Sequence, residues 1–302
     1  DCSSFNMSYK ALLALQSLKG RADKSIAYYK KGMAKTELER QVLIGDVDKA
    51  IENDEFETWF QPQVDYSTGK IVGAEALVRW RHPQKGLLAP GVFLPILETN
   101  GKIKDVDMSM IDRVCRFIKK VKSKLPDRKL SVSGNLSRDY IYSPDIIDHI
   151  LRIVSENEVS LCDVHFEITE SAYMDNPDLL ISKVNEMRAA GLIVEMDDFG
   201  SAYSSLNNLK DINVDVLKLD MKFLSGSEQS ERSKIIISSV IDMAKKLGTS
   251  VIAEGVETKE QADMLYGFGC NVMQGYYFSK PVPEAEYEKI LMNNISFNSA
   301  GN

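Results

Sequence analysis

The sequence predicts an α/β fold: a TIM-like (β/α)8 barrel with one antiparallel strand, preceded by a short N-terminal α/β appendage. From Phe56 onward, strand-like segments alternate with helical ones, which is typical of a parallel sheet covered by helices. The chain has 302 residues and a single barrel takes ~250, so one barrel plus a small appendage accounts for the length. The alternation opens with a hairpin, so one strand must run antiparallel to its neighbour. The number of units favours a closed barrel over an open sheet.

Residues 1–52 are expected to form a separate N-terminal segment. Helical patterns over 9–18 and 36–53 flank a β-like stretch at 25–31, "SIAYYKK". These elements are too short to enclose a substantial core of their own. The barrel domain is therefore expected to span residues 53–302.

The barrel elements follow in order from the opening hairpin, which joins strands at 56–65 and 71–80 through a turn at 66–70. The later strand-like segments lie at 129–137, 163–171, 192–200, 214–220, 250–257 and 272–279. Helical patterns such as 107–125 and 232–248 separate them. Each strand is thus expected to be followed by a helix on the outside of the barrel.

Composition limits the classes of function. Hydrophobic residues make up 44% and charged residues 27%, the mixture of a soluble globular protein. The net charge of -7 argues against a DNA or RNA polymer as partner, although a small anionic ligand can bind where cations mediate. The four cysteines lie far apart without a C-x-x-C pair, which predicts reduced thiols in place of a zinc site or a disulfide framework.

The expected location is the cytoplasm, with no membrane contact by this segment. No apolar run approaches the ~20 residues that span a bilayer, and no signal peptide opens the sequence. Because the first residue is Asp1, the chain is expected to be a fragment, and a longer protein could be a membrane-anchored sensor with this part in the cytoplasm.

Glu75 is an unusual residue for a half-buried strand. Along 71–80, "IVGAEALVRW", side chains alternate between two faces, and one of these faces is entirely apolar. Glu75 and Arg79 share the other face. A charge is seldom kept on a packed face unless something pairs with it or binds to it. Glu75 is therefore a candidate functional residue.

Polar side chains also end the other predicted strands, where the loops of such barrels converge and chemistry is done. These residues are Glu75, Asn135, Glu167, Asp197, Asp198, Lys218, Glu254 and Gln274. A single acid at a strand end is commonly a helix cap, but capping does not explain acids on consecutive strands. Crowded carboxylates repel one another unless some are protonated or cations lie among them. Oxygen ligands without Cys or His suit Mg²⁺ or Mn²⁺.

Seven motifs in order resemble those of the EAL-domain phosphodiesterases that degrade cyclic di-GMP. They are "EAL" at 75–77, "NLS" at 135–137, "EITES" at 167–171, "DDFG" at 197–200, "LKLD" at 217–220, "AEGVE" at 253–257 and "QGYYFSKP" at 274–281. The resemblance covers about 56–295. Upstream, "ALLALQSLKG" and "SIAYYKKGM" resemble the end of a GGDEF-like cyclase domain whose signature loop is absent, so residues 1–52 are interpreted as a degenerate remnant and a linker helix.

The resemblance implies a two-metal phosphodiesterase. Two divalent cations, Mg²⁺ or Mn²⁺, would be held by Glu75, Asn135, Glu167, Asp197, Asp198 and Glu254. Such a pair can bridge an attacking water, lower its pKa and take up charge on the phosphoryl oxygens. Glu75, Glu254 and Lys218 would be catalytic, with Lys218 hydrogen-bonding the nucleophile. Alternatively, Lys218 only neutralises the surrounding carboxylates.

The resemblance also assigns residues to the ligand and to a control loop. Those expected to bind cyclic di-GMP are Gln61, Leu77, Arg79, Glu257 and Gln274. Arg79 would contact phosphate through a charge-assisted hydrogen bond, whereas Gln61 could equally be a surface amide of the hairpin. Glu170, Gly200, Ser201 and Ala202 would steady a loop that couples the metals to contacts within a homodimer. Glu170 could also be an ordinary acid at a helix N-terminus.

Two positions depart from the family pattern. Ala202 stands where a second glycine is usual, and alanine strains the backbone by ~1 kcal/mol if that position needs a positive φ. Glu195 lies one layer below Asp197, where small residues are usual, and it either pairs with a buried base or perturbs the site.

The favoured function is hydrolysis of one phosphodiester bond of cyclic di-GMP to linear pGpG, because all the matched ligands are present. The alternative is a weak or inactive receptor that binds cyclic di-GMP or a protein partner without turnover.

Overall fold

The computed structural model describes residues 4–18, 25–200, 211–221 and 231–297. Eight strands close into a barrel in the order β1, β9, β8, β7, β6, β5, β4, β2, and β2 pairs with β1 again. Their bounds are Phe56–Asp65 for β1, Lys70–His82 for β2, Ser131–Asn135 for β4, Val164–Thr169 for β5, Ile193–Phe199 for β6, Val216–Asp220 for β7, Ser250–Glu254 for β8 and Val272–Met273 for β9. Two short strands, β3 (Gly86–Leu88) and β10 (Val282–Pro283), extend the sheet beside β2 and β1.

The predicted direction of the strands is confirmed. Strand β1 runs antiparallel to both β2 and β9, and the other barrel neighbours are parallel. The hairpin forms because β1 and β2 alternate in polarity on either side of the turn at Tyr66–Gly69. The parallel strands therefore end at the same mouth of the barrel.

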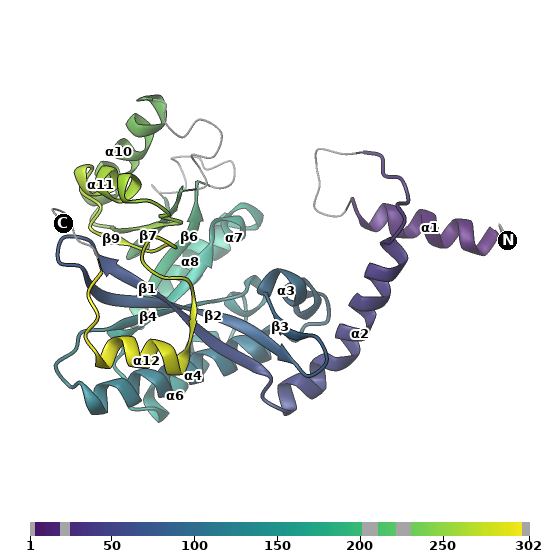
Figure 1. Cartoon of the computed structure of the whole chain (residues 1–302), viewed down its shortest axis with the longest axis horizontal. Coiled ribbons are helices and arrows are strands. Elements are labelled where there is room, and N and C mark those ends of the chain that lie inside the picture. Colours follow the sequence, from purple (N-terminus) through teal and green to yellow (C-terminus); the bar gives the residue numbers. More distant parts are fainter. Residues whose placement is uncertain (1–3, 19–24, 201–210, 222–230, 298–302) are drawn as a thin grey trace.

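Helices cover the outside of the barrel (Figure 1). Their bounds are Pro90–Thr99 for α3, Ile103–Lys124 for α4, Arg138–Ile141 for α5, Ile146–Glu156 for α6, Glu170–Asp175 for α7, Pro177–Ala189 for α8, Glu231–Lys246 for α10, Lys259–Gly267 for α11 and Glu284–Met292 for α12. The longest of them, α4, buries Val114, Phe117, Ile118 and Val121 at helical spacing against the sheet. This apolar layer fixes the strands, so charged side chains can be held inside the barrel.

The N-terminal segment consists of helices α1 (Ser4–Gln16) and α2 (Met33–Glu52), as the helical patterns predict. Leu43, Val47 and Ala50 of α2 pack into a second core with Phe56 and Trp80 of the hairpin. Figure 1 shows α1 at the far end of α2, away from the barrel. The last half of α2 is therefore packed onto the barrel, although the sequence placed it in the N-terminal segment.

The β-like stretch at 25–31 is not a strand, and that expectation is wrong. Residues 26–30 have no regular structure, and Ile26 and Tyr28 are 67% and 77% exposed. A strand needs a neighbour to satisfy its backbone groups, and every described strand pairs within the barrel sheet.

The final predicted strand is shorter than expected, because the regular ladder of β9 ends at Met273. Beyond it the chain turns close to the segment after β8: a Cβ on Gly275 would stand 2.1 Å from the carbonyl oxygen of Val256. Only glycine permits this approach. The contact, with the Gln274 carbonyl accepting from Val256 N at 3.1 Å, sets Gln274 at the barrel mouth.

Within the described residues, no helix combines the length and apolar character needed to cross a membrane.

Candidate active site

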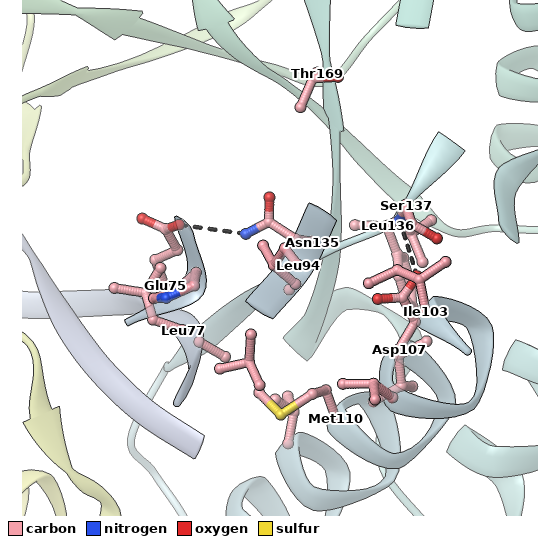
Figure 2. A pocket seen from close by; sticks show the side chains of 18 of the residues that line it. Glu75, Leu77, Leu94, Ile103, Asp107, Met110, Asn135, Leu136, Ser137 and Thr169 are labelled. Carbon is pink, nitrogen blue, oxygen red and sulfur yellow. Dashed lines mark hydrogen bonds between the residues drawn. The ribbon is translucent and has the colours of Figure 1, made fainter. Parts of the chain in front are cut away.

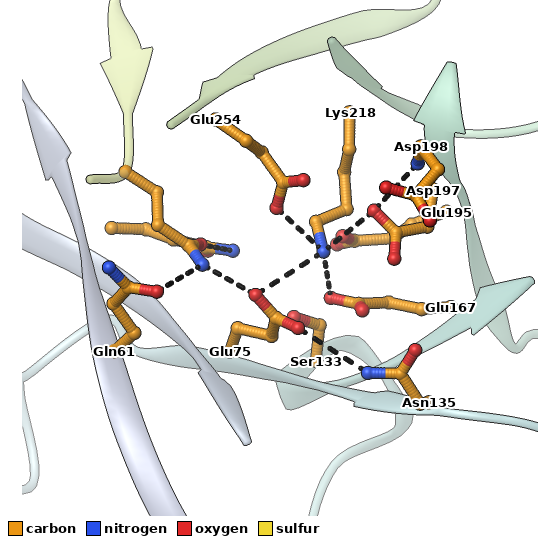
Figure 3. Close-up of polar contacts among 12 residues, drawn as sticks. Gln61, Glu75, Ser133, Asn135, Glu167, Glu195, Asp197, Asp198, Lys218 and Glu254 are labelled. Carbon is orange, nitrogen blue, oxygen red and sulfur yellow. Dashed lines mark hydrogen bonds and ion pairs between the residues drawn. The ribbon is translucent and has the colours of Figure 1, made fainter. Parts of the chain in front are cut away.

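Lys218 is the centre of the acidic mouth (Figure 3). Its side chain projects inward from β7 and is 0% exposed. Its Nζ lies 2.7 Å from Glu167 Oε1, 2.8 Å from Glu254 Oε1, 3.2 Å from Asp197 Oδ1 and 3.6 Å from Glu75 Oε2. One cation thus faces four carboxylates that come from four strands. The convergence predicted from the strand ends is confirmed for these five residues.

The titration of this cluster reflects its burial. Burial raises the pKa of Glu167 and Glu254 well above the ordinary range. Repulsion from Glu75 and Asp197 raises both pKa values further, whereas the ammonium of Lys218 lowers them. Burial acts to lower the pKa of Lys218, but the surrounding carboxylates raise it well above its usual value. Lys218 is therefore a permanent cation at neutral pH, and the site carries more acid than this one base can balance.

A network of amides fixes Glu75. Gln274 Nε2 donates to Glu75 Oε2 and lies 3.2 Å from Gln61 Oε1, and Gln63 Nε2 donates to Gln274 Oε1 at 3.3 Å. Asn135 Nδ2 lies 3.4 Å from Glu75 Oε1. Gln61 is buried and its Nε2 donates to the Ser279 carbonyl at 3.1 Å, so it is not a surface amide. Sequence reasoning missed Gln63, although it shares a face of β1 with Gln61.

The end of β6 is bent where its two aspartates lie. The register between β6 and β7 shifts between Met196 and Phe199, and Asp198 has a left-handed φ of 57°. Asp198 N donates to Asp197 Oδ1 at 2.8 Å. Asp197 therefore remains buried beside Lys218 while Asp198 is exposed, a division that bulges near functional sites commonly produce.

Glu170 hydrogen-bonds the first residue of the loop after β6, Gly200. Glu170 starts α7, is buried, and its Oε2 accepts a hydrogen bond from Gly200 N at 3.3 Å. Gly200 has a φ of 100°, which glycine adopts readily. Ser201 and Ala202 lie outside the described residues, so the predicted strain at Ala202 stays a prediction.

Glu195 pairs with a base, His165, that is only partly buried. His165 Nδ1 on the neighbouring strand β5 lies 2.6 Å from Glu195 Oε1, and His165 Nε2 lies 3.3 Å from the carbonyl of Cys162. Glu195 is 0% exposed. Of the two readings that the sequence left open, the structure supports the pair.

A cavity of about 380 Å³ adjoins Glu75 and Asn135 (Figure 2). Its walls come from β2, β4, α3 and α4, and the apolar ones include Leu77, Leu94, Ile103, Met110 and Leu136. Asp107 of α4 is buried in this wall, where its Oδ2 accepts from Ser137 N at 2.9 Å. Burial raises the pKa of Asp107 to about 7. Asp107 has no signal in the sequence, because only the packing of α4 against the segment after β4 brings it there.

Two of the expected ligand contacts lie beyond this centre. Arg79 is half-buried, with its guanidinium carbon 5.8 Å from the centroid of the Trp59 ring. Glu257 is exposed ahead of α11, and its backbone N–H donates to Gln261 Oε1 at 2.8 Å. The structure thus places Leu77 in the cavity wall with Glu75, places Arg79 further along β2, and shows no contact of Glu257 with the acidic mouth among the described residues.

The donor set fits a hard cation. The mouth offers carboxylate and amide oxygens, and Glu167 Oε2 is buried without a hydrogen-bond partner in the part of the chain that the structure describes. In that same part, no three His, Cys, Asp or Glu side chains close around a metal position. Lys218 is instead the counter-charge in the arrangement described here.

These features define an α/β barrel whose acidic mouth is suited to hard cations. The family model described as the EAL domain matches residues 44–281, and this chain belongs to that family. The chain is 34% identical over 245 residues to the probable cyclic di-GMP phosphodiesterase PdeG of Escherichia coli strain K12, covering 81% of this chain and 48% of that protein.

Two further relatives agree with this membership. The cyclic di-GMP phosphodiesterase NbdA of Pseudomonas aeruginosa is 32% identical over 279 residues, which cover 92% of this chain and 36% of that protein. The solved structure of the PaMucR phosphodiesterase in complex with c-di-GMP superposes with a TM-score of 0.76 at 30% identity, covering 82% of this chain and 99% of that one. This chain spans less than half the length of PdeG and NbdA.

Proposed function

We propose that this chain hydrolyses one phosphodiester bond of cyclic di-GMP to linear pGpG with the help of two divalent cations, Mg²⁺ or Mn²⁺. The observation that carries the proposal is the surplus of acid: among the described residues, Lys218 is the one base paired with Glu75, Glu167, Asp197 and Glu254. Such a surplus is costly unless further cations join it. Membership of the EAL family and the named activity of the relatives support the same reaction.

The cations would be held by side chains on five strands, namely Glu75, Asn135, Glu167, Asp197, Asp198 and Glu254. When bound, they supply acidification of the attacking water and neutralisation of the phosphoryl oxygens. Lys218 Nζ, already held by Glu167 and Glu254, can hydrogen-bond the nucleophilic oxygen and orient it. Glu75 is kept in one orientation by Gln274, so its carboxylate need not rearrange during the reaction.

The ligand would extend from this centre along β1 and β2. Arg79 supplies a charge for a phosphate group, and Gln61 and Gln274 line the floor beside Glu75. The apolar cavity beside Leu77 is large enough for a purine base, and the buried carboxyl of Asp107 in its wall is an acceptor suited to the two N–H groups on the guanine edge. A base held there would place the adjoining phosphate near Glu75.

The test is hydrolysis by the purified chain. Cyclic di-GMP is incubated with the protein and Mg²⁺ or Mn²⁺, and linear product is separated by chromatography. We expect pGpG to form, chelation to stop it, and Glu167→Gln to reduce the rate at least about a hundredfold. Tight binding measured by calorimetry without product under any metal would assign the chain to the receptor class, and absence of both would reject the proposal.

Three further points stay predictions from the sequence: a homodimer formed through the barrel, a cytoplasmic location, and descent of residues 1–52 from a GGDEF-like domain.

A further inference from the structure

Arg79 is a cation that lies over an aromatic ring. Its guanidinium carbon lies 5.8 Å from the centroid of Trp59, and one nitrogen, Nη1, donates to the Val78 carbonyl at 2.9 Å. Burial lowers its pKa from the usual value, since the side chain is partly withdrawn from water. Within the described residues it has no carboxylate partner inside 4.0 Å; Glu75 and Tyr276 act on it electrostatically, and the ring of Trp59 is its aromatic contact.

The hairpin register places Trp59 on the face of the sheet that carries Glu75 and Gln61. Gln61 lies opposite Glu75, Trp59 opposite Leu77, and Glu57 opposite Arg79. Residues opposite each other on antiparallel strands share a face, so the ring lies beside Leu77 on the side of Glu75. The other face of β1 carries the core residues Phe56 and Phe60.

The ring itself is fixed by a second set of contacts. Trp59 Nε1 donates to Glu57 Oε2 at 3.2 Å, and Arg81 Nη2 donates to the same oxygen at 2.8 Å. Glu57 is thereby kept as an anion, because its hydrogen bond with Arg81, together with the weaker one from Trp59, lowers its pKa. Arg81, Glu57, Trp59 and Arg79 thus contact one another in that order. Each contact restricts the rotamers of the next side chain.

We propose that Trp59 is a positioning residue that holds the Arg79 guanidinium toward a phosphate of the ligand. The inference rests on the proposed function, and it adds a residue that the EAL motifs do not include. Face-on contact with an indole is the strongest of the cation–π pairings and leaves the edge of the guanidinium, with its N–H donors, available for phosphate. Without the ring, a long arginine side chain would have to be ordered by the ligand itself.

A double-mutant cycle tests this inference. The proteins are wild type, Trp59→Leu, Arg79→Ala and the double variant, with Trp59→Phe as the matched control that keeps a ring. KM and kcat for cyclic di-GMP are measured, or the dissociation constant if the wild type binds without turnover. We expect Trp59→Leu to raise KM about tenfold with kcat within about twofold, and Trp59→Phe to recover most of the loss.

The decisive arm is Trp59→Leu in the Arg79→Ala background. If Trp59 acts through Arg79, the second change should alter KM by less than about twofold there. An equal tenfold effect in both backgrounds would overturn the inference and indicate direct contact with the ligand. An unchanged KM in Trp59→Leu, or a fall in kcat that Trp59→Phe does not recover, would overturn it as well. Failure of the proposed function is distinct, because the wild type would then neither bind nor cleave cyclic di-GMP.

Discussion

Two clusters of ionisable side chains lie one above the other inside the same barrel, and the ratio of bases to acids differs between them. At the mouth, Lys218 faces four carboxylates, whereas one layer below, His165 faces Glu195 alone. Glu195 and Glu167 are register partners on β6 and β5, so the two clusters share the same strands. Burial by itself therefore does not distinguish a functional acid from a structural one. The difference is the number of acids for each base: Glu195 has His165 as its own partner, whereas four carboxylates share Lys218, and a one-to-four cluster calls for more cations.

The largest effect is expected from removing the single base of the mouth. In Lys218→Met, four buried carboxylates lose their counter-charge, so in chelator-containing buffer the free energy of unfolding should fall by about 3–5 kcal/mol and turnover should vanish. Urea unfolding measures the first and chromatography the second. The matched control is Lys183→Met, which removes a nearly buried lysine whose ion-pair partner in the described part of the chain is the exposed Glu186, and it should cost less than about 1 kcal/mol. Equal losses in both variants would contradict the comparison.

The next effect separates chemistry from folding. Glu75→Ala should reduce turnover at least about a hundredfold, because an acid of the proposed metal set is lost. Its free energy of unfolding should stay at or above that of the wild type, since the change relieves repulsion in a crowded cluster. Glu260→Ala, which removes an exposed acid on α11, serves as the control. Normal hydrolysis by a folded Glu75→Ala protein would remove Glu75 from the site.

Ion size offers a way to separate binding from cleavage. Ca²⁺ takes 6–8 oxygen ligands at 2.3–2.6 Å, whereas Mg²⁺ requires a near-octahedral shell at 2.0–2.1 Å. The acidic mouth should accept either ion, but water between calcium ions would be less acidified. We expect calorimetry to detect cyclic di-GMP binding in Ca²⁺ while chromatography shows cleavage only in Mg²⁺ or Mn²⁺. Equal turnover in Ca²⁺, or turnover after exhaustive chelation, would refute the two-metal mechanism.

Much of this site follows from the sequence because strand periodicity and barrel geometry act locally. Alternation along 71–80 identifies Glu75, and the polar strand ends identify the residues that meet at Lys218. The same alternation could have found Gln63, two residues from Gln61 on β1. These signals need only the spacing within one strand and the rule that parallel strands end together.

The remaining features depend on contacts between elements, which spacing does not specify. The partner of Glu195 is set by the register between β5 and β6, and the contact of Asp107 with Ser137 depends on how α4 packs. The irregular structure of residues 26–30 has a related cause. Residues with a high β-propensity form a strand only where a neighbouring strand is available to pair with them. Trp59 is a further case, since its contact with Arg79 crosses the hairpin.

A smaller effect is expected at Asp107, namely a dependence of the free energy of unfolding on pH. Its pKa is about 7 in the folded protein and 3.8 as the reference, so the folded state holds more protons between these values. The stabilising contribution is complete below pH 3.8 and is lost as pH rises through 7. The free energy of unfolding of the wild type should therefore fall between pH 5 and 8 relative to Asp107→Asn, by at most ~3 kcal/mol. Parallel urea-unfolding curves for the two proteins at all pH values would contradict the assignment.

The smallest effect on activity is expected at Glu195, and it tests the comparison most directly. Glu195→Gln keeps an acceptor for His165 but puts an amide nitrogen where Glu195 Oε2 lies buried without a hydrogen-bond partner among the described residues, so the free energy of unfolding should fall by about 1–3 kcal/mol. Both kcat and KM should stay within about twofold of wild type, because Glu195 already has His165 as its partner and lies outside the proposed metal set. Glu167→Gln is the matched control, since it makes the same change at the register partner and should lose activity at least about a hundredfold. If Glu195→Gln lost activity as Glu167→Gln does while remaining folded, the lower pair would belong to the site, and the balance of charge would no longer separate structural acids from functional ones.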